Sequence, residues 1–161
     1  MRKYYLIKII YKNKRLYVIW YGDEEDGFVV EYNRLVTFES IDDAKFFAER
    51  NHILLEEGIS IYVFSDAIEL NDQINDSEKC GMIINIWNFF SDLAKTLNEE
   101  FIGDSDQEQI LKIYEKLFYG CNLKAINQGK EEYHPSFDES ERNKFIQILR
   151  NGFSILDKQL G

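Results

Sequence analysis

The residues of this chain best suited to nucleophilic catalysis are Cys121 and His134. A thiol that passes its proton to an imidazole becomes a strong nucleophile when a third group orients that base. No orienting group and no local motif of a cysteine enzyme accompanies this pair in the sequence. His52 lies near Glu56, but no nucleophile is identifiable beside it. We therefore expect a protein that is not an enzyme.

A second set of residues has the spacing of a calcium-binding loop. Asp104, Asp106, Glu108 and Glu115 match positions 1, 3, 5 and 12 of the loop that binds Ca²⁺ between two helices. Position 6, where a glycine permits the sharp turn, is Gln109 instead. The two histidines and two distant cysteines do not have the spacing of a structural zinc site either. We expect no metal and no cofactor, since acids at helix N-termini explain these positions more simply.

The strongest chemical feature is an uneven distribution of charge. The chain has 29 Asp and Glu against 19 Lys and Arg, a formal net charge of −10. Residues 1–20 contain six basic residues and no acidic one, whereas residues 21–78 contain sixteen acidic residues and three basic ones. The densest acidic run, residues 23–26, lies between two glycines and beside aromatic residues. A field of this size affects which partners approach and how fast they do so.

We expect the acidic run and its aromatic neighbours to bind a basic protein partner. A row of carboxylates resembles nucleic-acid phosphates in charge, and aromatic anchors slow the dissociation of a complex. Further acids in the same part of the sequence would speed encounter with a basic surface. The predicted partner-binding residues are Trp20, Tyr21, Asp23, Glu24, Glu25, Asp26, Glu31, Asp42 and Asp43.

A mainly antiparallel sheet is expected to position the acidic run. Apolar, β-branched and aromatic residues predict strands over 4–11, 16–21, 28–38 and 59–64. Asn13 tolerates positive φ, which fits a hairpin turn between the first two strands. Ser40 is placed to cap a helix that runs to Gly58, before the fourth strand. A loop or short helix over 65–76 follows.

Helical spacing replaces the strand pattern after residue 76. The predicted helices run from Glu78 to about Leu97, from Ser105 to Gly120 and from Asp138 to Leu160. Ser77 is expected to cap the first of them. The pairs Ser105–Glu108 and Asp138–Glu141 have the spacing of a capping box at the start of the other two.

These elements predict an α+β fold. An N-terminal sheet of the order β-β-β-α-β is expected to pack with about three C-terminal helices. We expect one domain over residues 1–161, with a β-rich part over 1–76 and a helical part over 77–161.

The first residues do not have the pattern of a signal peptide, because Lys8 interrupts their apolar run. The most apolar helical stretch is broken by Asn85 and Asn88, so that no membrane span is expected. Two cysteines without a motif suggest the free thiols of a cytoplasmic protein. Lysines, arginines and tyrosines alternate in the first hairpin, a composition typical of nucleic-acid binding. The acidic segment and the pI near 4.7 argue against a nucleic-acid partner, because phosphates would be repelled.

The chain resembles the immunity proteins of bacterial contact-dependent growth inhibition and related polymorphic-toxin systems. The likeness covers the overall plan of an acidic, aromatic-rich chain with a β-rich front and a helical back. It extends to the segment Leu117-Phe118-Tyr119-Gly120-Cys121-Asn122-Leu123 and to Glu132-Tyr133-His134-Pro135. The resemblance implies tight, one-to-one and non-catalytic binding of the C-terminal domain of a cognate toxin, often a basic nuclease.

A cytosolic module that senses a small molecule is the alternative hypothesis. Its ligand would lie in a pocket between sheet and helices, lined by Trp20, Tyr32, Trp87 and Phe90.

Overall fold

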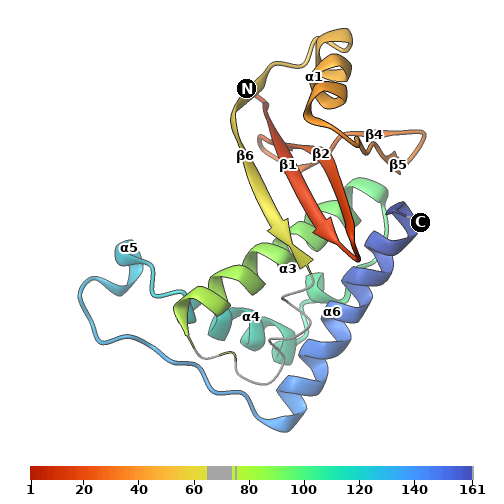
Figure 1. The fold of residues 1–161 in the computed structure, drawn as a ribbon. Coiled ribbons are helices and arrows are strands. Elements are labelled where there is room, and N and C mark those ends of the chain that lie inside the picture. Colours follow the sequence, from red (N-terminus) through yellow and green to blue (C-terminus); the bar gives the residue numbers. More distant parts are fainter. Residues whose placement is uncertain (65–73, 75, 161) are drawn as a thin grey trace. The chain divides into compact units, whose positions relative to one another are not determined.

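The chain begins with a β-hairpin made of β1 (Lys3–Tyr11) and β2 (Lys14–Gly22) (Figure 1). Lys12 and Asn13 between them have φ of 48° and 64°, as the tightest hairpin turns require. Asn enters this left-handed region readily, so the predicted turn is confirmed. The computed structural model describes residues 1–64, 74 and 76–160. Its fold is α+β, as predicted.

The chain divides into two compact units. One comprises Met1–Ser65, Asp92–Glu99 and Ile155–Gly161, and the other comprises Asp66–Ser91 and Glu100–Ser154. The C-terminal ends of two long helices therefore belong to the same unit as the sheet. The predicted boundary at residue 76 placed them in the helical part instead. The loop or short helix expected over 65–76 lies almost entirely outside the described residues. A single domain over 1–161 stays a prediction.

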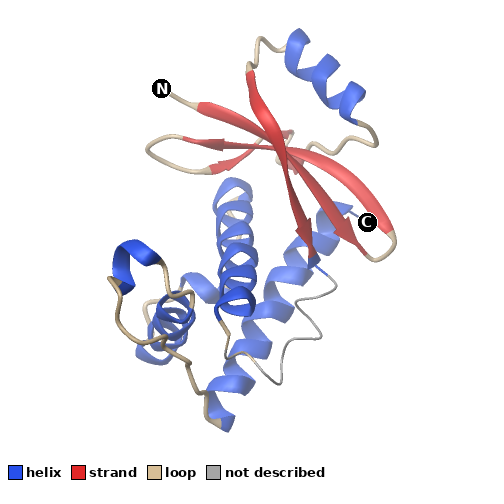
Figure 2. Cartoon of the chain, turned by 60° about the vertical axis from the view of Figure 1, so that its left-hand side comes forward, coloured by secondary structure: helices blue, strands red, loops and turns tan. Residues whose placement is uncertain are grey.

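The sheet of the first unit has four strands in the order β3-β2-β1-β6. The strands are drawn in red in Figure 2. The outer members of the sheet are β3 (Gly27–Phe28) and β6 (Leu55–Val63). The β1–β2 and β2–β3 pairs are antiparallel, as expected, whereas β1 and β6 are parallel. A parallel neighbour requires a crossover, and α1 (Ile41–Arg50) lies in that connection. Leu6 and Ile19 of the sheet form a buried cluster with Ala44 and Ala48 of this helix.

The single third strand predicted over 28–38 is wrong. The chain instead forms β3 and a separate two-stranded ribbon, β4 (Val30–Glu31) and β5 (Arg34–Leu35). Tyr32 and Asn33 between these strands have φ of 51° and 59°. Positive φ at both central residues reverses the chain in a two-residue turn, which breaks the extended run.

The predicted end of α1 at Gly58 is also wrong, because the helix ends at Arg50. Its start is confirmed, since Ser40 Oγ accepts a hydrogen bond from the Asp43 N–H. His52 has φ of 57°, and the Ile53 N–H donates to the Ala48 carbonyl over 2.8 Å. This bond reaches back across a left-handed residue, the usual way in which a helix end satisfies its last carbonyls.

The second unit is helical. It contains most of α3 (Ser77–Leu97) and α6 (Glu139–Leu160), together with α4 (Glu108–Gly120) and the short α5 (Lys124–Asn127). The predicted apolar face of α3 is confirmed, with Ile83, Trp87 and Phe90 almost fully buried. Phe90 contacts Phe153 of α6 edge to face, with ring centroids 5.1 Å apart. Such contacts stabilise beyond the apolar area that they bury.

Two predicted helix starts differ from the structure and one is confirmed. Asp76, and not Ser77, caps α3, because its Oδ1 accepts from the Lys79 N–H over 2.8 Å. Glu108 makes no capping bond that would complete a box with Ser105, whose Oγ accepts from the Gln107 N–H. The box at α6 is present in full and is described next.

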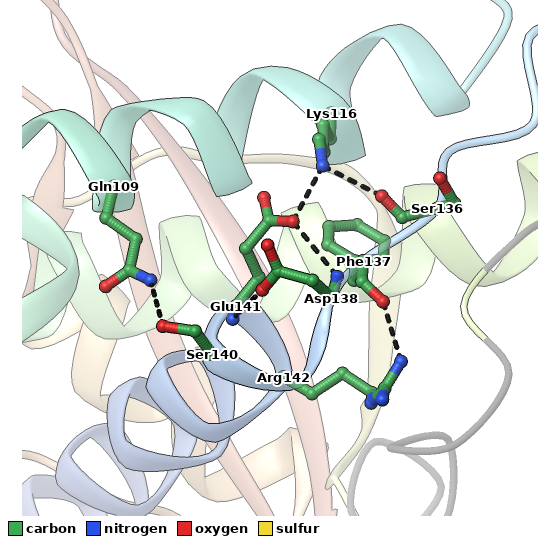
Figure 3. Close-up of polar contacts among 8 residues, drawn as sticks. All are labelled: Gln109, Lys116, Ser136, Phe137, Asp138, Ser140, Glu141 and Arg142. Carbon is green, nitrogen blue, oxygen red and sulfur yellow. Dashed lines mark hydrogen bonds and ion pairs between the residues drawn. The ribbon is translucent and has the colours of Figure 1, made fainter.

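Asp138 and Glu141 cap α6 reciprocally (Figure 3). The Asp138 N–H donates to Glu141 Oε1 over 3.1 Å, and the Glu141 N–H donates to Asp138 Oδ1 over 2.8 Å. Glu141 is only 5% exposed, and its Oε1 also accepts from Lys116 Nζ of α4 over 2.8 Å. Lys116 Nζ donates in addition to the carbonyl of Ser136. One buried ion pair thus joins two helices and the loop that precedes α6.

Candidate partner-binding site

The acidic run forms the connection between β2 and β3. β2 ends at Gly22 and β3 begins at Gly27, so the four acids occupy the whole of the loop. All four side chains are exposed. Asp23 lies nearest a positive charge, since its Oδ1 is 3.7 Å from the amino group of Met1. A solvent-exposed pair at this distance neutralises little of the charge of the loop.

An open groove of about 800 Å³ lies beside this loop in the sheet-containing unit. It is lined by Tyr21, Glu24, Glu25, Asp26, Val30, Asp92, Lys95, Thr96, Asn98 and Glu99. Five of these ten residues are carboxylates, and Lys95 is the single cation among them. Asp92 to Glu99 come from the C-terminal part of α3 and the residues that follow it. The groove therefore brings together acids from two separate parts of the sequence.

The end of α3 adds to the negative potential of the groove. Asn98 has φ of 55°, the Asn98 N–H donates to the Lys95 carbonyl, and the Glu99 N–H donates to the Ala94 carbonyl over 2.8 Å. These bonds satisfy some of the last carbonyls, but the partial negative charge of a helix C-terminus remains in this turn. The negative charge of Glu99 is partly offset by Lys158 of α6, whose Nζ lies 3.6 Å from Glu99 Oε2. A cationic side chain is the chemical group that this groove suits best.

A close approach at Gly27 fixes the loop against α3. A Cβ at this buried position would lie 2.6 Å from the Tyr21 hydroxyl and 2.7 Å from Thr96 Oγ1. Thr96 is held firmly, because its hydroxyl accepts from the Phe28 N–H and donates to the Asp92 carbonyl. Only glycine leaves room for this contact, so the base of the groove is closely packed although its acids are exposed.

The two predicted aromatic anchors have different surroundings. Trp20 is half-buried, packs on Tyr5 with ring centroids 5.5 Å apart, and donates from Nε1 to Asp92 Oδ2 over 2.9 Å. It therefore positions a carboxylate of the groove and is not one of its lining residues. Tyr21 does line the groove, and the guanidinium of Arg2 lies 4.0 Å from its ring centroid. Among the predicted aromatic anchors, Tyr21 is the one that lines the groove.

The remaining predicted partner-binding residues do not line the groove. Glu31 lies in β4 opposite Arg34, and both side chains are exposed. Asp42 and Asp43 are exposed in the first turn of α1. The sequence did not predict that Asp92 and Glu99 line the groove. A helical pattern does not reveal which loop between strands lies beside the C-terminus of the helix.

The two thiols are not activated as nucleophiles. Burial raises the pKa of Cys80 to about 11 and raises the pKa of Cys121 as well, whereas reactive cysteines have a lowered pKa. The Cys121 thiol donates to the Leu117 carbonyl over 3.3 Å. His134 is exposed beside Glu132, with 3.7 Å between Nε2 and Oε2.

The residues with calcium-loop spacing do not form a loop. Asp104 ends the single turn of 3₁₀ helix η2 (Ile102–Asp104) and accepts from Ser91 Oγ over 2.5 Å, while Glu108 and Glu115 lie in α4. Within the part of the chain that the structure describes, no three His, Cys, Asp or Glu side chains are placed to hold a metal ion.

The pocket that the alternative hypothesis expects, lined by Trp20, Tyr32, Trp87 and Phe90, stays a prediction, because these residues belong to two different units. Tyr32 is 99% exposed at the turn of the β4–β5 ribbon, whereas Trp87 and Phe90 are buried in the helical unit. That unit has a different cavity of about 440 Å³, formed by the end of α4, α5 and the loop after it. Apolar walls dominate it, and its lining residues are Phe118, Tyr119, Asn122, Leu123, Ile126, Asn127, Lys130, Glu131 and Tyr133.

Asn122 holds this cavity in shape. Its Nδ2 donates to the Tyr133 carbonyl and to Ser77 Oγ, and its Oδ1 accepts from the Tyr133 N–H and from Asn127 Nδ2. One side chain thereby fixes both sides of the loop.

The chain matches no protein-family model, no curated protein and no solved structure. None of the helices described in the structure has the length and the hydrophobicity needed to cross a membrane.

Proposed function

We propose that this chain is a cytoplasmic immunity protein that binds and neutralises the C-terminal domain of a cognate toxin. The observation that carries the proposal is the groove beside residues 23–26, where five carboxylates and one lysine converge. Such a surface attracts a basic face, increases the rate of association, and disfavours partners of like charge. The toxin domain is expected to be a basic nuclease whose phosphate-binding residues contact these carboxylates. Binding is one to one and involves no catalysis.

Two further features fit this role. The acids of the loop are exposed, so that little protein structure must be disrupted to reach them. The base of the groove is closely packed, because a Cβ at Gly27 would overlap Tyr21 and Thr96. Close packing of the base keeps the conformational cost of binding low.

The first experiment is a growth assay. The C-terminal domain of the large protein encoded immediately upstream is expressed with and without this chain, and the two are co-purified. Toxicity that this chain relieves, together with a stable one-to-one complex, supports the proposal. Toxicity without rescue, or a harmless neighbour, contradicts it.

A matched pair of variants then tests the groove. Glu24→Gln, Glu25→Gln and Asp26→Asn together remove three charges from the groove. Glu31→Gln, Asp42→Asn and Asp43→Asn remove the same number of charges outside it. We expect the first variant to slow association with the toxin domain about tenfold at low salt and to flatten the salt dependence, and the second to slow it less. Equal effects would assign the attraction to net charge alone.

The 440 Å³ cavity supports a second candidate function, a small-molecule-sensing module. Its volume falls within the range of small-molecule sites, and its walls are mostly apolar. A thermal-shift screen of the chain alone tests this function, because a ligand that binds only the native state raises the melting temperature. A hit whose effect disappears in Ile126→Asp would locate the ligand in this cavity.

A further inference from the structure

The fold brings Cys80 and Cys121 together at the point where α3 begins and α4 ends. Cys80 lies in the first turn of α3, and Cys121 directly follows Gly120, the last residue of α4. Both cysteines belong to the helical unit, and both thiols are free. Two thiols that are far apart in the sequence therefore share one region of the structure.

Each of these cysteines lies against the glycine next to the other. A Cβ added at Gly120 would lie 2.6 Å from Cys80 Sγ. In turn, a Cβ added at Gly81 would lie 4.0 Å from Cys121 Sγ. Because glycine has no side chain, the two helix ends approach closely, and each sulfur lies in the space beside the opposite glycine. The thiols are also close enough that a charge on Cys121 raises the pKa of Cys80.

A hydrogen bond holds the two helix ends together. Asn122 Nδ2 donates to Ser77 Oγ over 2.8 Å, which joins the residue after Cys121 to the start of α3. The Cys121 thiol donates to the Leu117 carbonyl over 3.3 Å. A thiol is a weak donor, so this bond does little to keep the side chain from turning toward Cys80. The backbone is thus held in place while one sulfur remains able to turn.

Exposure gives the two thiols different roles. Cys121 is partly exposed, whereas Cys80 is fully buried. A reagent in solution therefore reaches Cys121 first, and Cys80 reacts with Cys121 from inside the protein. Redox-sensing cysteines have this arrangement, with an accessible thiol beside a resolving one. Because burial raises both pKa values, we expect the reaction to be slow at neutral pH.

We propose that Cys80 and Cys121 form a reversible disulfide when the protein meets a small-molecule disulfide, for which glutathione disulfide is the probe. The Cys121 thiolate attacks one sulfur of the probe, which forms a mixed disulfide and releases one glutathione. The Cys80 thiolate then attacks Cys121 Sγ and releases the second glutathione. The two thiol protons and two electrons of the protein pass to glutathione disulfide, which becomes two molecules of glutathione.

This disulfide connects the start of α3 to the end of α4 at the wall of the 440 Å³ cavity. Asn122 and Leu123, which follow Cys121, both line that cavity. Excess glutathione reverses the bond, as in the transient disulfides of cytoplasmic proteins. The acidic groove is formed by residues of the other unit, so this inference does not rest on the binding of a toxin.

Intact mass and peptide mapping of the folded chain test the proposal. The reduced chain is incubated with glutathione disulfide in the absence of denaturant, and the remaining thiols are then alkylated. We expect the mass to fall by that of two hydrogen atoms, no alkylation, and a peptide that links Cys80 to Cys121. Two free thiols, a glutathione that stays on Cys121, or a bond between two copies of the chain would each overturn the proposal.

Single variants test the order of the two steps. In Cys80→Ala, we expect Cys121 to keep one glutathione, because the resolving thiol is absent. In Cys121→Ser, we expect Cys80 to stay unmodified in the folded chain, because the reagent does not reach a buried thiol. Modification of Cys80 in Cys121→Ser as fast as that of Cys121 in the parent chain would overturn the assigned roles, and this comparison does not require Cys80→Ala to fold.

Urea denaturation tests whether the two helix ends already lie in the right place. A disulfide that fits the native backbone stabilises a protein, because it restricts the unfolded chain. We expect the midpoint of urea unfolding to rise by about 1 M on oxidation, whereas Cys121→Ser treated in the same way should not change. A midpoint that stays the same or falls would show that the bond distorts the two helices, and would overturn the geometry.

Discussion

The indole Nε1 of Trp20 donates a hydrogen bond to Oδ2 of Asp92 over 2.9 Å. This bond joins the last part of β2 to the C-terminal part of α3 and holds one carboxylate at the acidic groove. Burial raises the pKa of Tyr62 in β6, and the negative charge of Asp92 raises it further. Asp92 therefore contributes negative charge to the groove and also raises the pKa of a tyrosine in the sheet.

We expect Asp92→Ala to lower the free energy of unfolding by about 1–2 kcal/mol, because the half-buried indole N–H loses its acceptor. Trp20→Phe removes the donor as well as some packing. The double variant should cost less than the sum of the single variants by about 1 kcal/mol, measured by urea denaturation. Strictly additive costs would show that the bond contributes nothing to stability.

Gly27→Ala is expected to destabilise the protein by roughly 1–3 kcal/mol, since its Cβ would overlap the Tyr21 hydroxyl and Thr96 Oγ1. Tyr21→Phe removes that hydroxyl. Combined with Gly27→Ala, it should restore part of the lost stability. If the combined variant is no more stable than Gly27→Ala alone, the overlap with Tyr21 is not the cause.

Local signals in the sequence predicted those parts of the fold that local chemistry decides. Asn13 in its turn, Ser40 at α1 and the Asp138–Glu141 box each act within four residues, and each is confirmed. Ser105 had the same signal as Asp138 but makes a different bond, because the 3₁₀ turn η2 ends immediately before it.

The parts that could not be predicted depend on contacts between distant residues. The sequence placed acids at 23–26 but could not show that Asp92 and Glu99 join them, since strand order and helix packing decide that. Glu141 likewise had a capping signal, and nothing near it revealed that Lys116 would be its buried partner.

Two glycines in long helices should respond to alanine with opposite signs. At Gly152 of α6, a Cβ would overlap the ring of Phe90, so that Gly152→Ala should destabilise by roughly 1–3 kcal/mol. At Gly81 of α3, the nearest atom would be Cys121 Sγ at 4.0 Å. Gly81→Ala should therefore stabilise by about 0.5–1 kcal/mol, because alanine favours the helix. Thermal unfolding of both variants tests this contrast, and a shift of the same sign in both would contradict it.

Removing either partner of the Lys116–Glu141 ion pair should destabilise by about 3 kcal/mol or more, because the other charge is left buried. Glu141 Oε2 lacks a hydrogen-bond partner among the described residues, so the buried carboxylate depends on the contacts of its Oε1 with Lys116 and the Asp138 N–H. Lys116→Met with Glu141→Gln should cost much less than the sum of the single variants. Lys158→Met, at the more exposed pair with Glu99, is the control and should change stability by no more than about 0.5 kcal/mol.

Stability should fall in alkaline solution because of Cys80. Burial raises the pKa of this thiol to about 11 in the folded protein, from 9.0, and the nearby Cys121 and Asp76 contribute in the same direction. Below pH 9 both the folded and the unfolded chain keep the proton, so the contribution to stability is complete. Between pH 9 and about 11 the unfolded chain loses the proton first, which favours unfolding. This pKa difference lowers the free energy of unfolding by about 2–3 kcal/mol at the upper end of that pH range.

Urea denaturation at intervals from pH 7 to 11 measures this loss, and Cys80→Ala isolates the contribution of the thiol. The variant is less stable at neutral pH because it leaves a cavity, so the comparison is between slopes. We expect a shallower decline in the variant than in the parent protein. The decline should not vanish, because the pKa values of Tyr11 and Tyr62 are also raised and act in the same direction above pH 10. Parallel curves would show that the Cys80 thiol ionises at the same pH in the folded and the unfolded protein.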